Sequence, residues 1–531
     1  MKKIYIVLLA AVLAMTTSCK EGTLDTAPTD AVAGSTLLET TEGGYMALNG
    51  AIRWFWQWGV TVTGNAHQCF GPQGYALMGD LMGEDMVMAG QGNGWFWYDY
   101  LYDVKESYTN GAWRPYDCWN YYYTLICQVN YIINAAETMK GEQADIDYII
   151  GNAYAFRAYA YHYLEMTYAR SYIGHEDKLG VPVLLEPTTS KTTGKPRSTN
   201  REVYEQVVKD IDTAISLLEG KGKKHCSHID WHVANGIKAR VALYMGNWQT
   251  AFDAASNAVS GGKTLTADIL GGYNDADAKD VLWGAEIIEA QGTTNPQFLA
   301  HMDIAFGGYG EAARKCCSEW LYNKIPGGDA RKKWWNYEEL NKGGNTKVGY
   351  QQYKFRFADP SNTYTGADHI FMRVPEMYLT MAEAACRLGN DAQAQTILNE
   401  FMSYRVSGEF TYDCSAKTGT ALGSLTTDET GSLLEEIILQ RRIELWGEFG
   451  RIYDIKRLRQ GFVRTAEMGH PAAALLPTLK LNDPESFDWV LTIPQAELDA
   501  NPYILQNPVG SEAADGQSDD PALAPKVDAA E

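Results

Sequence analysis

The sequence predicts a mainly α-helical protein, built from antiparallel helix pairs and interrupted by one long irregular excursion. Three observations lead to this fold class. Apolar and small residues recur at steps of three and four along most of the chain, which is the period of an amphipathic helix. Two distant segments share one helix-turn-helix pattern. Between them, about 262–370 is rich in Gly, Asn, Asp and aromatic residues, which favours irregular structure with short strands.

The first residues are typical of an export signal. Lys2 and Lys3 give a positive start, and the apolar run 4–15 is too short to span a bilayer. Small residues precede Cys19, so 1–18 is interpreted as a lipoprotein signal peptide and Cys19 as the lipid-modified first residue of the mature chain. Ordinary secretion with cleavage nearby is the alternative.

The residues after Cys19 are expected to form a lipid-anchored tether, 19–44, because this stretch begins polar and contains proline. The remainder, 45–531, is interpreted as one domain. No later segment is long and apolar enough to span a membrane, so we expect the lipid alone to hold the protein there.

Helical periodicity covers most of this domain. Asp230 can cap a helix that opens at Trp231, and Thr199 or Asn200 can cap one that continues through Ile211. The predicted helices span about 118–140, 146–170, 201–219, 231–260, 375–405 and 431–459.

An internal similarity refines the prediction. Ala239-Arg-Val-Ala242, followed by Gly246-Asn247, matches Ala382-Glu-Ala-Ala385, followed by Gly389-Asn390. Small residues let two antiparallel helices approach closely and glycine forms the turn, as in tetratricopeptide-type pairs. The copies are too far apart to be tandem neighbours, so 262–370 must leave the helical scaffold. A similar loop-like composition marks 56–115, and loops on rigid scaffolds often carry binding residues.

Composition excludes one class of partner and leaves others open. The formal net charge of −21 and the pI near 4.9 argue against nucleic acid, which requires clustered Lys and Arg. Cys19 aside, the cysteines have neither a CxxC pair nor the spacing of zinc ligands, so most are interpreted as small buried hydrophobes.

The densest charge pattern, 441–457, is interpreted as structural rather than catalytic. Arg441 shares a helical stripe with Leu434 and Ile438, which places it beside the core, where Glu383 or Glu444 would have to pair with it. We therefore expect a buried ion-pair network.

Two further patterns could carry chemistry, but neither is taken as evidence of a functional site. His225, His228 and His232, with Cys226 and Asp230 among them, could collect a metal, but a polar helix entry is favoured. Adjacent carboxylates such as those at 84–85 do not indicate a glycosidase pair, which depends on a separation in space. We expect no catalytic residues, no metal and no cofactor.

Aromatic clusters are the best functional signal, because a sugar ring can stack its C–H face on an indole while its hydroxyls need polar partners. Trp54 to Trp58 are expected in the core. In an extended segment Trp95 and Trp97 would share one face and form a platform. The candidate ligand-binding residues are Asn93, Trp95, Trp97, Tyr98, Asp99, Trp334 and Trp335.

Several motifs, in order and with joint spacing, resemble one family. They are Ala155-Phe-Arg-Ala-Tyr159, Gly180-Val-Pro-Val183, Arg197-Ser-Thr199 with Glu202-Val-Tyr204, Arg373-Val-Pro-Glu-Met-Tyr378, Arg441-Arg-Ile-Glu-Leu445, Gly450-Arg-Ile-Tyr-Asp454, Leu491-Thr-Ile-Pro-Gln495 and Gln506-Asn-Pro508. Through them the chain resembles the SusD/RagB-like nutrient-binding outer-membrane lipoproteins of the Bacteroidetes.

The resemblance implies a SusD-like α-helical domain with four tetratricopeptide-like helix pairs beside an irregular ligand-facing region. It also implies a partner, a SusC-like TonB-dependent transporter barrel on which the lipoprotein sits as a lid. The expected function is therefore non-catalytic glycan binding at the surface of the outer membrane and delivery to that transporter. A binder of peptides or another non-glycan nutrient, and a surface glycoside hydrolase, are the alternatives.

Overall fold

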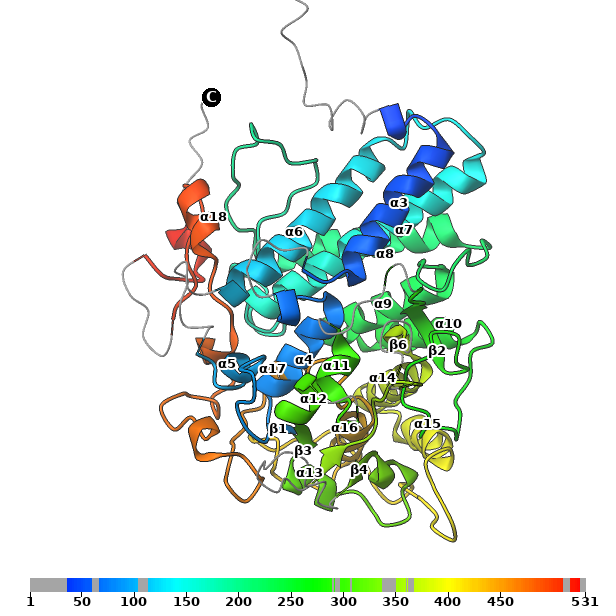
Figure 1. Ribbon diagram of the computed structural model, residues 1–531, viewed down its shortest axis with the longest axis vertical. Coiled ribbons are helices and arrows are strands. Elements are labelled where there is room, and N and C mark those ends of the chain that lie inside the picture. The colour runs from blue at the N-terminus through cyan, green and yellow to red at the C-terminus, as the bar shows by residue number, and fades with distance from the viewer. Residues whose placement is uncertain are drawn as a thin grey trace, which may run out of the picture.

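A computed structural model describes residues 36–59, 66–103, 113–288, 291, 297–305, 308–336, 350–359, 361, 367–509 and 516–525. The expected signal peptide, Cys19 and most of the tether lie outside these residues. The expected end of the tether at 44 is wrong, because residues 41–44 form the first turn of a packed helix. The predicted mainly α fold is confirmed, with long helices in the upper half of Figure 1 and short strands in the lower half.

Four long helices form the upper half of the molecule. They are α3 (Thr41–Trp56), α6 (Trp113–Asn134), α7 (Gln143–Tyr168) and α8 (Asn200–Leu218). Helix α7 packs against the other three, and from Ile146 onward its residues are buried on nearly every side. Such all-round burial explains why its apolar periodicity is weak, because no face remains for solvent.

Two helix pairs follow, and both match the internal similarity. Helices α9 (Trp231–Met245) and α10 (Trp248–Val259) turn at Gly246, and α14 (Val374–Arg387) and α15 (Asp391–Ser403) turn at Gly389. Both glycines have positive φ angles, 76° and 78°, a backbone region that glycine adopts without steric cost. Although far apart in sequence, the pairs are neighbours in space, since α10 packs on α14.

The excursion between the pairs contains short elements, as its composition predicts. Strands β2 (Val281–Ala285) and β6 (His369–Arg373) pair antiparallel, which brings the end of the excursion back to its beginning. A second antiparallel sheet has the order β1-β3-β5-β4. Its strands are β1 (Met86–Met88), β3 (Lys315–Cys317), β4 (Trp335–Asn336) and β5 (Gln351–Gln352). The short helices of this region are α11 (Phe298–Met302), α12 (Gly308–Ala312), α13 (Glu319–Asn323) and η3 (Ala330–Trp334).

The segment 56–115 is less loop-like than its composition suggests. It contains η1 (Ala66–Gln68), α4 (Pro72–Met82) and α5 (Trp97–Tyr100). Helix α4 is buried and packs against α17 (Arg451–Leu458). Helix α16 (Leu433–Glu444) precedes α17 in the chain and packs on α14.

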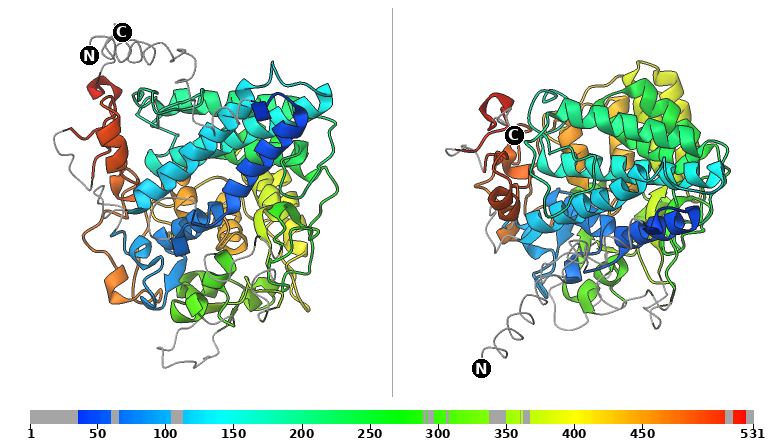
Figure 2. Two further views of the ribbon diagram at one scale, coloured as in Figure 1. Left: turned by 45° about the horizontal axis from the view of Figure 1, so that its top comes forward. Right: turned by 90° about the horizontal axis from the view of Figure 1, so that it is seen from above.

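The C-terminal segment returns along one side of the helical layer and is drawn orange to red in Figures 1 and 2. The backbone N–H of Leu491 donates to the carbonyl of Thr167 at 3.0 Å, and that of Leu179 donates to Asp519 at 2.8 Å. Its elements are η4 (Ala472–Ala474), η5 (Phe487–Trp489), α18 (Gln495–Ala500) and η6 (Pro521–Leu523). Among the helices described, none has the length and apolarity that crossing a membrane requires.

The charged block lies in the core as a network of ion pairs, which confirms its structural interpretation. The expected partner of Arg441 is wrong, however, because its Nε donates to Asp454 at 2.8 Å rather than to Glu383 or Glu444. Glu383 instead accepts from Arg457, at 2.6 and 2.8 Å. A helical stripe shows which side chains face the core, but the pairing depends on how α16, α17 and α14 approach one another.

Candidate ligand-binding site

The segment 93–100 does not have the extended backbone that a shared Trp95–Trp97 face requires. Phe96 has a left-handed backbone with φ 63°, and α5 begins at the next residue. The expectation that Trp95 and Trp97 form one platform is therefore wrong. Trp97 is only 9% exposed and packs 5.7 Å from Tyr100. Trp95 faces a different direction and remains partly exposed.

Asp99 is a structural residue in this arrangement. Its two carboxylate oxygens each accept a hydrogen bond of 2.8 Å from the guanidinium of Arg114, and both side chains are buried. This bidentate pair joins α5 to the first turn of α6 and leaves Asp99 unavailable to a ligand.

Trp334 and Trp335 belong to the core. They are 0% and 2% exposed, the indole N–H of Trp334 donates to the carbonyl of Ile269 at 2.7 Å, and Trp335 packs edge-on against Trp446 at 5.7 Å. Neither ring offers a face to a ligand in this structure, so we leave both out of the proposed site.

Trp95 instead joins two residues that the sequence did not single out. Its indole stacks on the ring of His67 at 5.1 Å and 17°, and Tyr309 meets both rings edge-on at 6.0 and 5.6 Å. The Tyr309 hydroxyl and His67 Nδ1 are 2.6 Å apart. We call Trp95, His67 and Tyr309 the Trp95 platform. All three side chains are partly exposed.

Two of the predicted ligand residues lie beside this platform in the chain and are accessible. Tyr98 is 44% exposed, and Asn93 is also exposed. Gly92 and Gly94 on either side of Asn93 have positive φ angles of 51° and 86°, so the chain turns sharply here before α5. The site thus offers aromatic faces next to hydroxyl and amide groups. This combination suits a ligand with an apolar face and polar edges, as a sugar has.

Position 67 could not have been identified from its own sequence context. A single histidine outside an aromatic run carries no signal, and its contact with Trp95 depends on how η1 meets the 93–100 turn. The stacking is a tertiary contact, so periodicity does not report it.

The histidines near 225–232 do not converge. His228 lies between Tyr148 and Asn49, with its Nε2 3.0 Å from the Asn49 Oδ1, whereas His232 contacts the carbonyl of Asn257. Burial, with nearby cationic groups, lowers the pKa of His228 to about 4, so its ring is neutral at pH 7. Within the described ranges, no group of three or more His, Cys, Asp or Glu side chains is placed to hold a metal ion.

The adjacent carboxylates Glu84 and Asp85 are buried and bound to arginines. Arg442 reaches Glu84 at 3.0 Å and Asp85 at 2.7 Å, and Arg451 reaches Glu84 at 2.9 Å. These contacts give the pair a structural role.

Comparison with known protein families covers most of the chain. A family model described as the SusD family matches residues 254–509, and one described as starch-binding associating with outer membrane matches residues 77–243. The chain belongs to the SusD family. It is accordingly related to proteins that are described as starch-binding and associated with the outer membrane. Nothing among the curated proteins matches the chain significantly.

Solved structures of SusD-like proteins share this fold. A SusD-like carbohydrate binding protein from Bacteroides vulgatus is 24% identical, with a TM-score of 0.74 over 88% of this chain and 97% of the other. A SusD superfamily protein from Bacteroides thetaiotaomicron is 23% identical, with a TM-score of 0.71 over 88% and 100%. Surface glycan-binding protein A from Bacteroides fluxus is 18% identical, with a TM-score of 0.64 over 87% and 97%.

Proposed function

We propose that this SusD-family protein binds a glycan at the cell surface without altering it and passes it to a SusC-like TonB-dependent transporter. In this proposal residues 1–18 are removed, the lipid on Cys19 anchors the chain in the outer membrane, and 45–531 acts as one binding domain. Family membership supports the ligand class and the membrane. The transporter and the lipid anchor rest on the sequence motifs.

The observation that carries the proposal is the Trp95 platform. Two stacked rings and an edge-on tyrosine form an aromatic surface that remains partly open to solvent, with Tyr98 and Asn93 beside it in the chain. Aromatic rings of this kind bind through dispersion and the burial of apolar area, and both act on the C–H face of a pyranose. The polar neighbours supply hydrogen bonds that select among hydroxyl orientations.

Affinity electrophoresis of the protein from about Glu21 onward, against a panel of soluble polysaccharides, tests the proposal. We expect at least one glycan to retard the wild type and Trp95→Ala to weaken that binding about tenfold, because a stacked aromatic contact contributes on the order of 1 kcal/mol or more. Trp58→Ala is the matched control, since Trp58 follows the end of α3 and, contrary to the expectation of a core position, is 41% exposed and lies outside the platform.

Two results would contradict the proposal. Equal loss of retardation in Trp58→Ala and Trp95→Ala would show that the effect is not specific to the platform. Absence of retardation by every polysaccharide would favour the peptide or other-nutrient alternative, which the burial of Trp97 also favours because it removes one of the expected stacking faces.

A further inference from the structure

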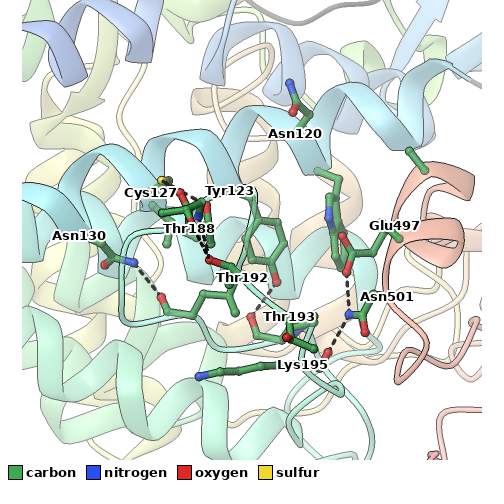
Figure 3. A pocket seen from close by; sticks show the side chains of 18 of the residues that line it. Asn120, Tyr123, Cys127, Asn130, Thr188, Thr192, Thr193, Lys195, Glu497 and Asn501 are labelled. Atoms are coloured by element: carbon green, nitrogen blue, oxygen red, sulfur yellow. Dashed lines mark hydrogen bonds between the residues drawn. The ribbon is translucent and has the colours of Figure 1, made fainter. Parts of the chain in front are cut away.

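A separate cavity of about 350 Å³ lies between α6, the loop 182–195 that precedes α8, and α18 (Figure 3). None of its lining residues belongs to the Trp95 platform. The volume is in the range of small-molecule sites, which are mostly apolar with a few placed polar groups.

The loop over this cavity is fixed at both ends. The Tyr123 hydroxyl donates to the Pro182 carbonyl at 2.7 Å, and the Asn130 amide donates to two further loop carbonyls at 3.0 and 3.1 Å. At the other end, the amide of Asn501 donates to the carbonyl of Lys195 at 2.8 Å (Figure 3). The hydrogen bonds hold the cavity open before any ligand arrives, so little ordering is required on binding.

The apolar part of the lining combines aliphatic residues with three aromatic ones from α6. Trp119 and Tyr123 are four residues apart on one face of α6, with ring centroids 4.7 Å apart. Because the hydroxyl of Tyr123 is bonded to the loop, that side chain contributes its ring to the cavity. Tyr116 lines the same side one turn earlier.

The polar part of the lining is hydroxyl and amide groups with one charge of each sign. Thr193, Lys195 and Glu497 line the cavity, and Figure 3 shows them around the space under α6. In the described part of the chain, the Thr193 hydroxyl and the Lys195 ammonium have no hydrogen-bond partner. One carboxylate oxygen of Glu497 accepts a hydrogen bond from the Asn501 amide at 2.8 Å. These groups can donate to and accept from a ligand at several points.

We propose that this cavity is a second carbohydrate site, which takes a monosaccharide or the end of a short oligosaccharide. The partly exposed rings of Tyr116 and Tyr123 match the C–H face of a pyranose, and the threonine, lysine and glutamate groups match its hydroxyls. The balanced single charges do not favour a phosphate or another strongly charged ligand. The ligand class of this second site rests on the proposed function. Its location rests on the cavity alone.

Saturation-transfer NMR with glucose, galactose, mannose, xylose, N-acetylglucosamine and their β-1,4-linked disaccharides tests this site. All proteins carry Trp95→Ala, so that the platform does not contribute. Ala496→Trp is the blocking variant, because Ala496 is exposed on α18 and lines the cavity. Ala392→Trp is the matched control, since Ala392 is an exposed helical alanine on α15 that does not line it.

We expect at least one sugar to receive saturation from the Trp95→Ala protein, and Ala496→Trp to abolish that signal while Ala392→Trp retains it. Thr193→Val, which removes one hydroxyl and keeps the shape, should weaken binding about two- to tenfold, the range for one hydrogen bond.

The inference is overturned if no sugar receives saturation, or if Ala496→Trp binds as well as Ala392→Trp. Neither result bears on the platform, because polysaccharide retardation is measured with Trp95 intact. Conversely, saturation transfer without retardation by any polysaccharide would support the cavity site and contradict the Trp95 platform.

Discussion

Several buried carboxylates in this protein meet more than one arginine each. Glu444 accepts from Arg405 at 2.9 Å and from Arg373 at 3.1 Å, and Asp454 accepts from Arg441 and Arg457 at 2.8 and 2.6 Å. A buried charge without a partner is costly, whereas a bonded group of charges is tolerated and fixes the geometry of the elements that carry it. With the pair Arg457–Glu383, these contacts join α16 and α17 to α14, to Arg373 at the end of β6 and to Arg405 just after α15.

Glu84 gives this network a measurable pH dependence. Burial would raise its pKa, but the guanidinium groups of Arg451 and Arg442 outweigh burial and lower it from 4.5 to about 2. Because folding lowers this pKa, the resulting stabilisation is complete above pH 4.5 and is lost as the pH falls through 2. It is on the order of 3 kcal/mol. We expect urea midpoints measured between pH 7 and pH 2 to fall across this window.

The variant Glu84→Gln should be less stable than wild type at pH 7, and the difference should shrink toward pH 2. Glu219→Gln, at an exposed position, should follow the wild-type curve. A Glu84→Gln protein whose midpoint falls as steeply as that of wild type would assign the acid sensitivity to other groups.

For the charged residues, the sequence predicted which side chains are buried better than it predicted their ion-pair partners. The helical stripe placed Arg441 beside the core, as found, because periodicity reports which face is buried. It could not choose Asp454 over Glu383 or Glu444. Burial was predicted less well at the candidate site, where Trp95 is partly exposed but Trp97 is buried, since the turn at Phe96 separates their faces.

Helix α8 begins with a capping box that the sequence located to within one residue. The Thr199 hydroxyl accepts from the N–H of Glu202 at 3.3 Å, and the Glu202 carboxylate accepts from the N–H of Thr199 at 2.8 Å. Asn200, the other candidate cap, instead donates its amide to the carbonyl of His175.

Thr199→Ala should therefore destabilise the protein by about 1 kcal/mol, because it removes the acceptor for an N–H group of the first turn. Thr213→Ala is the control, since Thr213 is partly exposed in the same helix and its hydroxyl donates to the carbonyl one turn earlier, that of Lys209. Equilibrium unfolding in urea measures both. Equal midpoints for the two variants would contradict a role for the cap.

Elements with ordinary periodicity were predicted well, and α4 was not. The composition of 56–115, which includes the glycines and the first proline of α4, predicted a loop at 72–82. The reason is tertiary, because a Cβ at Gly79 would lie 3.0 Å from the Cα of Gly450 at the start of α17. Glycine is needed for the close approach of two helices, and this need overrides its poor helix propensity.

The molecule as a whole is held together without disulfides in its described residues. There, no disulfide is formed by any of eight cysteines, most of which are buried: Cys69, Cys118, Cys127, Cys226, Cys316, Cys317, Cys386 and Cys414. A core of apolar residues that extends from Leu38 to Ile504 supplies the cohesion instead.

We expect the unfolding temperature of the protein from about Glu21 onward to be the same with and without a thiol reductant. Titration with a thiol reagent in denaturant should count eight free cysteines. A lower count, together with a reductant-sensitive unfolding temperature, would indicate a disulfide that this structure does not contain.

At this scale the sequence predicted the order of the helix pairs along the chain, but not which pairs pack together. The two similar pairs contain matching small residues, which predicted each turn. Nothing in the sequence indicated that α10 and α14 would pack together across an excursion of more than a hundred residues, because that contact is set by the pairing of β2 with β6.

The return of the C-terminal segment constrains the order in which the protein can mature. Asn507 donates to the carbonyl of Tyr168 at 2.8 Å, a contact between positions 339 residues apart, and Arg170 binds Asp519 at 2.6 Å. During synthesis the N-terminal residues emerge first. One side of helices α6 and α7 therefore stays uncovered until nearly the whole chain has been made. Contacts this distant slow folding, so this side of the helical layer is the last to be covered.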